Sequence, residues 1–480
     1  MKKGFLARIF GEPSILARLG NRFEGQKDFK MRKIPLESGC LTLVYLDSMT
    51  DAEQVGRFVL TPLTLSGGAV TAQNVMRLVT QAAGQRCGDF DIALKNLLGG
   101  YCLIFLADGS CFAFDTKMTE GRSITEPPTN SVSKGPREGF VESVKTNVAL
   151  LRRRLKTDDF RCDETTVGRY TATTVEICYV DGIADEKTVQ RIKKRIAKID
   201  IDGIIDSSFV ARFLDDDKSG FFKLVGSSEK PDVVAAKLLE GRIAVLVDGS
   251  PVALTLPYLF IEDLQAAEDY YEAARMSTVN RVLRALSVIM AVFIPALYVS
   301  LQTFNYQILP AKFLITIITA TQSIPFKPFE EMVLVLVLFD MLREANFRMP
   351  RFAGISLSVV GAVVLGDAAV KAGLLGAPAV MIGALSGIGL YSMPENSLLF
   401  SLLRLVFLVL GRLSGLYGLT LFGLALAAYI INLDTLGYPY AAPFAPEVLS
   451  DEKDAIAKLP LEKMKLRPKS LKNKNEVRQK

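Results

Sequence analysis

Seven ionisable side chains lie within or beside strongly hydrophobic segments, and their chemistry is the most informative in this chain. They are Glu330, Glu331, Asp340, Asp367, Lys371, Glu395 and Arg404. An ionisable group costs about 3 kcal/mol on insertion into a bilayer, so it usually faces a helix bundle, a partner or water. These seven residues are therefore candidates for an ion path or for polar contacts inside a membrane.

Spacing separates some of these residues into pairs. Asp367 and Lys371 are four residues apart, so a helix places them on one face where each can neutralise the other. Asp340 and Arg343 are three apart and favour the same kind of pairing. We expect mainly structural pairing at both positions, with a place along a conduction path as the alternative for Asp367 and Lys371.

Glu330 and Glu331 follow a proline-rich break at residues 325–328, at the expected outer end of a hydrophobic segment. In an oligomer, a ring of such carboxylates would concentrate cations before a pore. Glu395 follows Met393 and Pro394 and could act similarly on the same side, with a solvated loop carboxylate as its alternative.

The elements that must position these residues are hydrophobic segments between residues 283 and 433. Residues 283–304 approach the roughly 20 apolar residues that a helix needs to cross a bilayer. Five or six crossings are possible, and an even number would place both termini on one side, with Arg281 and Arg284 marking a cytoplasmic boundary. The segments lie near residues 285–304, 329–342, 353–370, 374–393, 398–411 and 413–433.

Small residues recur four apart in two of these segments. Gly383 with Gly387, and Gly411 with Gly415, have the spacing that lets helix backbones approach closely. We expect helix packing at these glycines, and the spacing does not distinguish contacts within one subunit from contacts between subunits.

Composition argues against an enzyme. The chain has no histidine, which excludes Ser-His-Asp and Cys-His catalysis and His-ligated zinc or haem. It also lacks the glycine-rich loops of P-loop and dinucleotide-binding proteins. None of the six cysteines forms a Cys-x-x-Cys pair, which suits a reducing compartment. We therefore assign no catalytic, cofactor-binding or metal-binding residue and expect no cofactor.

The residues before the hydrophobic region read as soluble α/β protein. Apolar runs at residues 40–46, 101–106 and 111–114 predict strands, with a helical pattern at 70–83. A second set follows, with strands at 173–180 and 242–247 and a helix at 185–199. The predicted fold class is an α/β cytoplasmic N-terminal region, with two small α/β subdomains, followed by an α-helical polytopic transmembrane bundle.

These patterns predict five segments of chain: an N-terminal extension at 1–39, subdomains at 40–150 and 151–280, a transmembrane domain at 281–434, and a basic tail at 435–480. The tail is expected in the cytoplasm. Its lysines and arginines could adhere to anionic lipid, at about 1 kcal/mol for each basic side chain, and a solvated tail is the alternative.

Several runs resemble one protein family. In the soluble part they are Lys-Gly-Pro-Arg-Glu-Gly-Phe-Val-Glu-Ser at 134–143, Asp-Gly-Ile-Ile-Asp at 202–206, and Leu-Glu-Gly-Arg-Ile-Ala-Val-Leu-Val-Asp-Gly-Ser-Pro at 239–251. In the hydrophobic part they include Ile-Pro-Phe-Lys-Pro-Phe-Glu at 324–330 and Gly-Tyr-Pro-Tyr-Ala-Ala-Pro-Phe-Ala-Pro at 437–446. These runs resemble the A subunits of bacterial spore germinant receptors, the GerA family.

The resemblance implies a polytopic subunit in the inner membrane of the spore. It implies a transporter-like B subunit and a lipoprotein C subunit as partners, with self-association through the membrane helices to form or gate an ion channel that responds to nutrients. No nucleic-acid partner is expected.

Two alternatives remain beside a receptor subunit. An accessory member of the same family could modulate ion or dipicolinate release without a nutrient partner of its own. A secondary transporter would favour inverted repeats and broken helices. No convincing internal repeat is visible in the sequence, so the transporter is the less favoured of the two.

Overall fold

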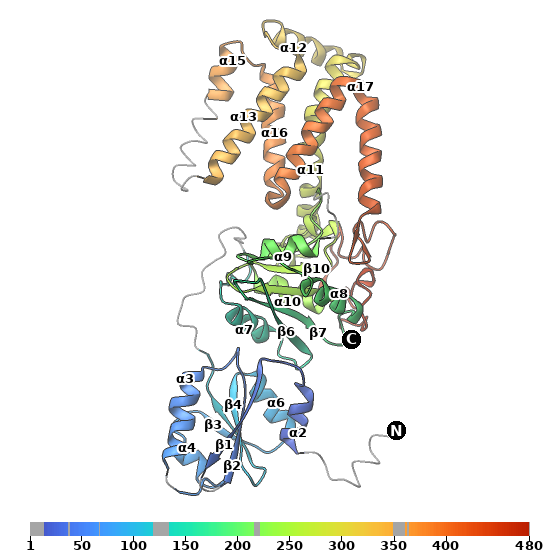
Figure 1. Ribbon diagram of the computed structural model, residues 1–480. Coiled ribbons are helices and arrows are strands. Elements are labelled where there is room, and N and C mark those ends of the chain that lie inside the picture. The colour runs from blue at the N-terminus through green and yellow to red at the C-terminus, as the bar shows by residue number, and fades with distance from the viewer. Residues whose placement is uncertain are drawn as a thin grey trace. The chain divides into compact units, whose positions relative to one another are not determined.

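The computed structural model describes residues 14–36, 39–66, 68–118, 134–215, 221–348, 361 and 364–479. They form two compact units. The N-terminal unit comprises Met1–Asp216, Lys223–Tyr258 and Lys465–Lys480, and the helical unit comprises Asp217–Phe222 and Leu259–Met464. The first unit is built on two β-sheets, and helices dominate the second (Figure 1).

A five-stranded antiparallel sheet, in the order β1-β2-β4-β5-β3, forms the first part of the N-terminal unit. Its strands are β1 (Phe29–Leu36), β2 (Gly39–Leu46), β3 (Gly84–Cys87), β4 (Tyr101–Phe105) and β5 (Cys111–Asp115). One face carries α2 (Ile15–Arg22) and α6 (Phe90–Leu98), and the other carries α3 (Ala52–Gln54), η1 (Val55–Leu60), α4 (Thr61–Leu65) and α5 (Val75–Leu78). Because both faces are covered, the central strands read as continuous apolar runs.

Two features of this sheet differ from the sequence prediction. β1 lies within residues 1–39, the predicted extension, yet it pairs along its whole length with β2. It is an exposed edge strand rich in charged residues, so it lacks an apolar signal. The helical pattern at 70–83 produces only the short α5, because the chain enters β3 at Gly84.

A second five-stranded antiparallel sheet, in the order β6-β7-β9-β10-β8, follows in the same unit. Its strands are β6 (Phe160–Val167), β7 (Thr173–Val180), β8 (Gly226–Ser228), β9 (Ile243–Val247) and β10 (Ala253–Leu256). Its helices are α7 (Val144–Arg154), α8 (Glu186–Ile196), α9 (Ser207–Leu214) and α10 (Pro231–Leu239). Buried residues of α7 pack into the core of this sheet, so the second subdomain begins before the predicted residue 151.

The two sheets repeat one topology. In each, the strands occur in the spatial order first, second, fourth, fifth, third, and every pair is antiparallel. The turn between the fourth and fifth strands is Asp-Gly-Ser in both, at residues 108–110 and 248–250, with Gly109 at φ 82° and Gly249 at φ 86°. The sequence showed no convincing repeat, because what the two sheets share is mainly a pattern of apolar positions, which different apolar residues can occupy.

The helical unit contains α11 (Ala274–Thr303), α12 (Ala311–Thr321), α13 (Pro328–Arg348), η5 (Val364–Ala368), α15 (Ala369–Lys371), α16 (Ala377–Tyr391) and α17 (Ser397–Asn432). Within the described residues, two helices are long and apolar enough to cross a membrane, at Ala274–Thr303 and Pro394–Asn432. The apolar α12 and α16 are shorter. Most of the predicted segment 353–370 lies outside the described residues.

Short elements flank these helices. Before α11 come η2 (Phe260–Leu264) and η3 (Ala267–Tyr270), and η4 (Tyr306–Ile308) and η6 (Pro394–Asn396) lie between helices. After α17 the chain forms β11 (Asp434–Thr435), β12 (Tyr438–Pro439), η7 (Leu461–Lys463) and η8 (Lys469–Leu471).

A sharp bend divides α17 at Gly415, whose backbone has φ 63° and ψ −147° (Figure 1). Only glycine adopts this left-handed conformation readily. A Cβ at this position would also lie 3.0 Å from the Cβ of Phe304. Gly415 was predicted to pack one helix against another. In the structure it lies against Phe304, the C-cap of α11, and it also bends the chain between two helical arms.

Candidate functional site

Glu330 and Glu331 begin α13, but their side chains have different surroundings. Glu330 is exposed, and its carboxylate accepts a hydrogen bond from the backbone N–H of Lys327 at 3.3 Å. Glu331 is 1% exposed, and its carboxylate accepts a hydrogen bond from the backbone N–H of Gly376, the N-cap of α16. A helix N-terminus favours a negative charge, which compensates for burying Glu331. Of these two carboxylates, only that of Glu330 is therefore accessible from outside the helical unit.

Arg404 is the centre of a buried polar network. Its side chain is 0% exposed, and its Nη2 lies 2.8 Å from Oδ2 of Asp340. Arg404 also donates to the hydroxyl of Ser386 at 2.9 Å, and Ser401 donates to Asp340 at 2.6 Å. Ser386 in turn donates to the carbonyl of Ala291 at 2.6 Å. The network therefore links the four helices α11, α13, α16 and α17.

Two further features describe the charge pairing and hydrogen bonding of this network. Arg343, the predicted partner of Asp340, lies 3.3 Å from its other carboxylate oxygen, so Asp340 pairs with two arginines. Within the part of the chain that the structure describes, Nε of Arg404 is buried without a hydrogen-bond acceptor. Removing one partner of a buried ion pair typically costs about 3–5 kcal/mol, because the other charge stays buried.

The remaining charged candidates lie on the surface of the helical unit. Lys371 pairs with Asp367 at 2.8 Å, as their spacing predicts, and the two side chains are 75% and 60% exposed. Glu395 is exposed and follows the C-terminal end of α16, whereas Gly376 at the other end of α16 contacts Glu331. The prediction that Glu395 lies on the same side as Glu330 and Glu331 is therefore wrong.

The other glycines with small-residue spacing differ in their surroundings. A Cβ on Gly383 would lie 2.3 Å from Val335, so α16 and α13 meet closely there. A Cβ on Gly411 would lie 2.9 Å from the carbonyl oxygen of Ala296, so α17 and α11 meet there. A Cβ on Gly387 would have nothing within 4 Å among the residues that the structure describes, so its spacing marks no contact there.

A second buried arginine, Arg281, joins the two ends of the helical unit. It is 0% exposed, and its Nε lies 3.1 Å from the carboxylate of Asp269, which precedes α11. Its Nη1 donates to Asp454 Oδ1 at 3.0 Å and to the carbonyl of Ala455 at 2.7 Å, both after α17. Burial lowers the pKa of Lys458 beside this cluster. Sequence reasoning took Arg281 for a boundary marker and missed its acidic partners, because Asp454 lies 173 residues away.

In the N-terminal unit, the runs that carry the family resemblance meet at one end of the second sheet. Ser250, in the run 239–251, donates to Asp206 Oδ2 at 2.6 Å and contacts the hydroxyl of Ser207 at 3.0 Å. The neighbouring Asp248 accepts from the backbone N–H of Val144 at 3.1 Å. Three stretches that are distant in sequence thus hold one another in place.

Asp206 begins α9 and is the centre of this junction. Its carboxylate accepts from the backbone N–H of Ser208 at 2.8 Å, which caps the helix. Partial burial alone would raise the pKa of Asp206, but the hydrogen bonds from Ser250 and Ser208 outweigh burial and hold the pKa below its usual range. The junction therefore keeps Asp206 ionised and α9 fixed to the sheet.

Comparison with known proteins identifies the family. The family model described as Bacillus/Clostridium GerA spore germination protein matches residues 17–470. The chain belongs to the GerA family. Spore germination protein KA of Bacillus subtilis is 34% identical over 92% of this chain and 82% of its own length. Spore germination protein GerLA of Bacillus cereus is 30% identical over 96% of this chain and 98% of its own length.

Two further proteins resemble this GerA-family chain. The membrane protein YfkQ of Bacillus subtilis is 33% identical over 93% of this chain and 88% of its own length. The crystal structure of the N-terminal domain of the A subunit of the Bacillus megaterium spore germinant receptor GerK3 matches with 29% identity and a TM-score of 0.40. That match covers 51% of this chain and 94% of the GerK3 chain.

The C-terminal end of this GerA-family chain folds against the N-terminal unit. The backbone N–H of Lys474 donates to the carbonyl of Ile183 at 3.1 Å, and its ammonium group lies 3.1 Å from Glu186. Arg467 donates to the carbonyl of Leu239 at 2.7 Å, and Leu471 is 1% exposed. The last part of the predicted tail is therefore folded onto the second subdomain, and adhesion of its lysines to lipid stays a prediction.

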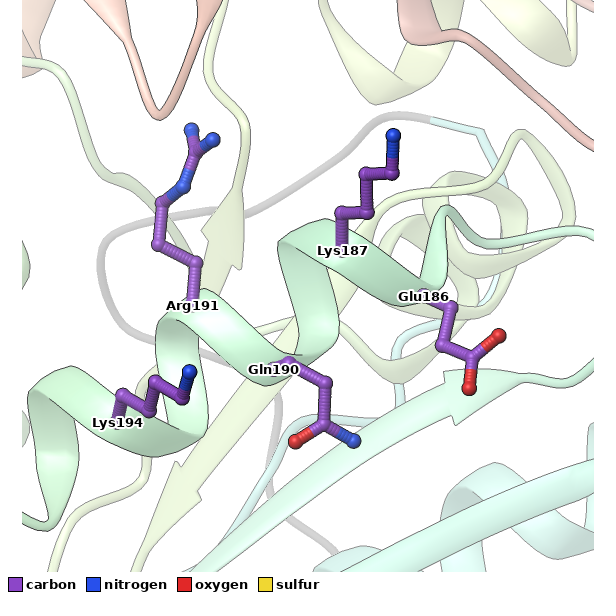
Figure 2. A pocket seen from close by; sticks show the side chains of 5 residues that line it. All are labelled: Glu186, Lys187, Gln190, Arg191 and Lys194. Atoms are coloured by element: carbon purple, nitrogen blue, oxygen red, sulfur yellow. The ribbon is translucent and has the colours of Figure 1, made fainter.

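No part of the described chain gathers three or more Cys, Asp or Glu residues in a way that could hold a metal ion. A depression of about 490 Å³ lies along α8 (Figure 2). All its lining residues come from this one helix, so it is a feature of an open surface. They are Glu186, Lys187, Gln190, Arg191 and Lys194.

Proposed function

We propose that this GerA-family chain is the membrane subunit of a spore germinant receptor, the A-type subunit. The observation that carries the proposal is the match across both units to proteins named for spore germination. In this proposal the chain lies in the inner membrane of the spore, with its N-terminal unit in the cytoplasm. A transporter-like B-type subunit and a lipoprotein C-type subunit are its partners.

We further propose that several copies assemble through their helices around an ion path that opens when a nutrient is sensed. Exposed apolar side chains along α11 and α17 support contacts with lipid or with other copies, and they include Leu286, Ile289, Leu413, Leu421 and Leu424. Such helices bury little of their apolar surface within one chain, so the chain needs an apolar environment around it.

The exposed and buried acidic residues receive different roles in this proposal. A pore between subunits is lined by side chains that are exposed in one isolated subunit. Glu330 meets this condition, and it is the candidate for a cation-concentrating ring. Glu331 and Arg404 are buried, and Asp340, the partner of Arg404, is half-buried, so their proposed role is to hold the arrangement of helices that the signal changes.

The subunit role is tested by deleting the gene and measuring dipicolinate release from spores. The panel contains amino acids, sugars and a trigger that does not depend on nutrients. Loss of the response to particular nutrients is the expected result. A uniform slowing with every nutrient would favour the accessory role. An unchanged response to the whole panel would contradict both.

The ion path is tested with Glu330→Gln and Glu331→Gln, made separately, in the reconstituted receptor. We expect Glu330→Gln to reduce cation flux about ten-fold, because neutralising the ring lowers the local cation concentration. Glu331→Gln should leave ion selectivity unchanged, since its side chain faces the N-terminus of α16. Unchanged flux and selectivity in Glu330→Gln would exclude the ring.

A further inference from the structure

The short helix α9 exposes three large apolar side chains in a row. Ile205, Phe209 and Phe213 are 74%, 38% and 43% exposed. Phe209 and Phe213 are four residues apart on α9, so they lie on one side of the helix, and Ile205 directly precedes the N-cap Asp206. The opposite side, with Val210 and Leu214, is buried against the subdomain. We call Ile205, Phe209 and Phe213 the apolar ridge.

The apolar ridge is held in this exposed position by the fold. Asp206 and Ser250 fix the start of α9 to the sheet. The backbone N–H of Ile204, just before the ridge, donates to the hydroxyl of Thr171 at 3.1 Å, and its carbonyl accepts from Thr173 at 2.8 Å. A fixed ridge of large apolar side chains in water is unfavourable, so its presence indicates an interaction surface.

Basic side chains lie next to the apolar ridge on α8, which packs against α9. Arg195 donates to the carbonyl of Leu214 at 2.9 Å, so this side of α8 faces the end of α9. Arg191 and Lys187 precede Arg195 by one and two turns on the same side. Figure 2 shows Lys187 and Arg191 extending away from Glu186 and Gln190. With the exposed Lys194, they form what we call the basic row.

The chain's own connectivity keeps this surface close to a bilayer. The N-terminal unit ends at Tyr258, and the first long apolar helix begins at Ala274. The intervening residues, fully extended, span about 50 Å at most. This tether limits how far Tyr258 can lie from the start of α11, and therefore from a bilayer that surrounds that helix.

We propose that the apolar ridge and the basic row together form a docking surface for an anionic lipid bilayer. The ridge enters the boundary between headgroups and acyl chains, and Lys187, Arg191 and Lys194 contact the lipid phosphates. Large apolar side chains beside lysines and arginines are typical of surfaces that lie in the membrane interface. Acidic headgroups also match the charge of the basic row. The N-terminal unit is then held against the membrane by this surface as well as by its tether.

The absence of tryptophan from the chain makes a direct test possible. Phe213→Trp, and separately Phe209→Trp, places a single fluorophore on the apolar ridge of the full-length protein. Each variant is reconstituted in nanodiscs of phosphatidylcholine with phosphatidylglycerol, with and without brominated acyl chains. We expect blue-shifted emission and strong quenching by brominated lipid at both positions. Leu65→Trp, at a 78% exposed site on α4, is the matched control and should show neither.

The contribution of charge is tested by adding Lys187→Glu, Arg191→Glu and Lys194→Glu to the Phe213→Trp variant. Each basic side chain near an anionic surface contributes about a five-fold change in affinity, so the triple change should abolish most of the quenching. In discs of phosphatidylcholine alone, quenching of the Phe213→Trp variant should be weaker than in discs that also contain phosphatidylglycerol.

Two results would overturn the proposal. The first is solvent-like emission from both ridge variants in anionic discs. The second is a blue shift that depends on the number of protein copies in each disc and occurs without quenching by brominated lipid. That result would mean that a second copy covers the ridge. The docking proposal requires the helices to lie in a bilayer but does not require them to conduct ions, so its failure is separate from failure of the proposed receptor function.

Discussion

The two sheets of the N-terminal unit share one strand order but differ in what their turns do. In the first sheet, the Asp108-Gly109-Ser110 turn is on the surface, and its hydrogen bonds are local. In the second sheet, Ser250 of the equivalent turn is 1% exposed and holds Asp206 at the start of α9. The two sheets thus share one fold, and the turn of the second sheet makes contacts that the turn of the first does not make.

The glycine before the fourth strand shows the same difference. Gly100 has φ 83° and approaches the carbonyl of Met49 within its own subdomain. Gly241 has φ 95° and instead faces Asn473 from the C-terminal end of the chain. The second repeat therefore contacts a segment that follows α17 in sequence.

The largest loss of stability is predicted for a substitution at Gly241, the glycine of the second repeat that faces Asn473. In Gly241→Ala, the new Cβ would overlap the side chain of Asn473, and alanine disfavours a positive φ. We expect a loss of about 3 kcal/mol in stability and release of residues 465–479 from the subdomain. Limited proteolysis of the purified chain, read by mass spectrometry, should show new cleavage in this segment.

Gly109→Ala is the matched control for this substitution. Gly109 also has a positive φ, but nothing lies within 4 Å of its Cβ position, so only backbone strain of about 1 kcal/mol is expected. If both variants kept the C-terminal segment protected, the close contact with Asn473 would have no role in holding it.

The second prediction concerns a pair of residues that differs between the repeats. β1 and β2 pair Lys33 with Thr42, and at the equivalent position β6 and β7 pair Glu164 with Glu176. Burial, with repulsion from Glu164, Asp28 and Asp163 and partial relief from Arg152, raises the pKa of Glu176 to about 8. The folded chain then binds one more proton than the unfolded chain between about pH 4.5 and pH 8. Its stability must therefore fall as the pH rises through that range.

Glu176→Gln should remove this dependence. Relative to the parent, the variant should gain about 4 kcal/mol in stability between pH 5 and pH 9. Denaturant unfolding of the purified chain at several pH values measures the gain. Glu24→Gln, at an exposed site in the same unit, should leave the pH profile unchanged. If the free energy of unfolding changed with pH equally in the parent and in Glu176→Gln, Glu176 would be ionised in the folded chain.

Comparing the repeats also explains which strands the sequence predicted. The runs at 40–46, 101–106, 111–114 and 173–180 correspond to β2, β4, β5 and β7, which are flanked by neighbours and covered by helices. The sequence missed the four edge strands β1, β3, β6 and β8, which are short or more polar. It also missed β10, an interior buried strand of only four residues. The helix predicted at 185–199 is α8, because its apolar period and its acidic first turn are strong signals.

Contacts at the candidate site were predictable only where the partners are close in sequence. The pair of Asp367 and Lys371 follows from helical spacing alone. Arg404 and Asp340 are 64 residues apart, and their meeting depends on how α13 and α17 rotate and cross. The sequence identified both as polar residues in apolar segments but could not identify them as partners. Arg281 was harder still, since two of its acceptors are backbone carbonyls, which carry no sequence signal.

The smallest effect is predicted for serine substitutions that compare the two Asp-Gly-Ser turns. Ser250→Ala removes a hydrogen bond to the ionised Asp206 and should cost about 1.5 kcal/mol. Ser110→Ala, at the equivalent position, should change stability by less than about 0.5 kcal/mol, because the hydrogen bonds described for Ser110 use its backbone. Hydrogen exchange of α9 separates a local from a global effect. Faster exchange confined to α9 in Ser250→Ala would show that the turn of the second repeat holds this helix, whereas equal exchange in both variants would mean that the two turns are equivalent.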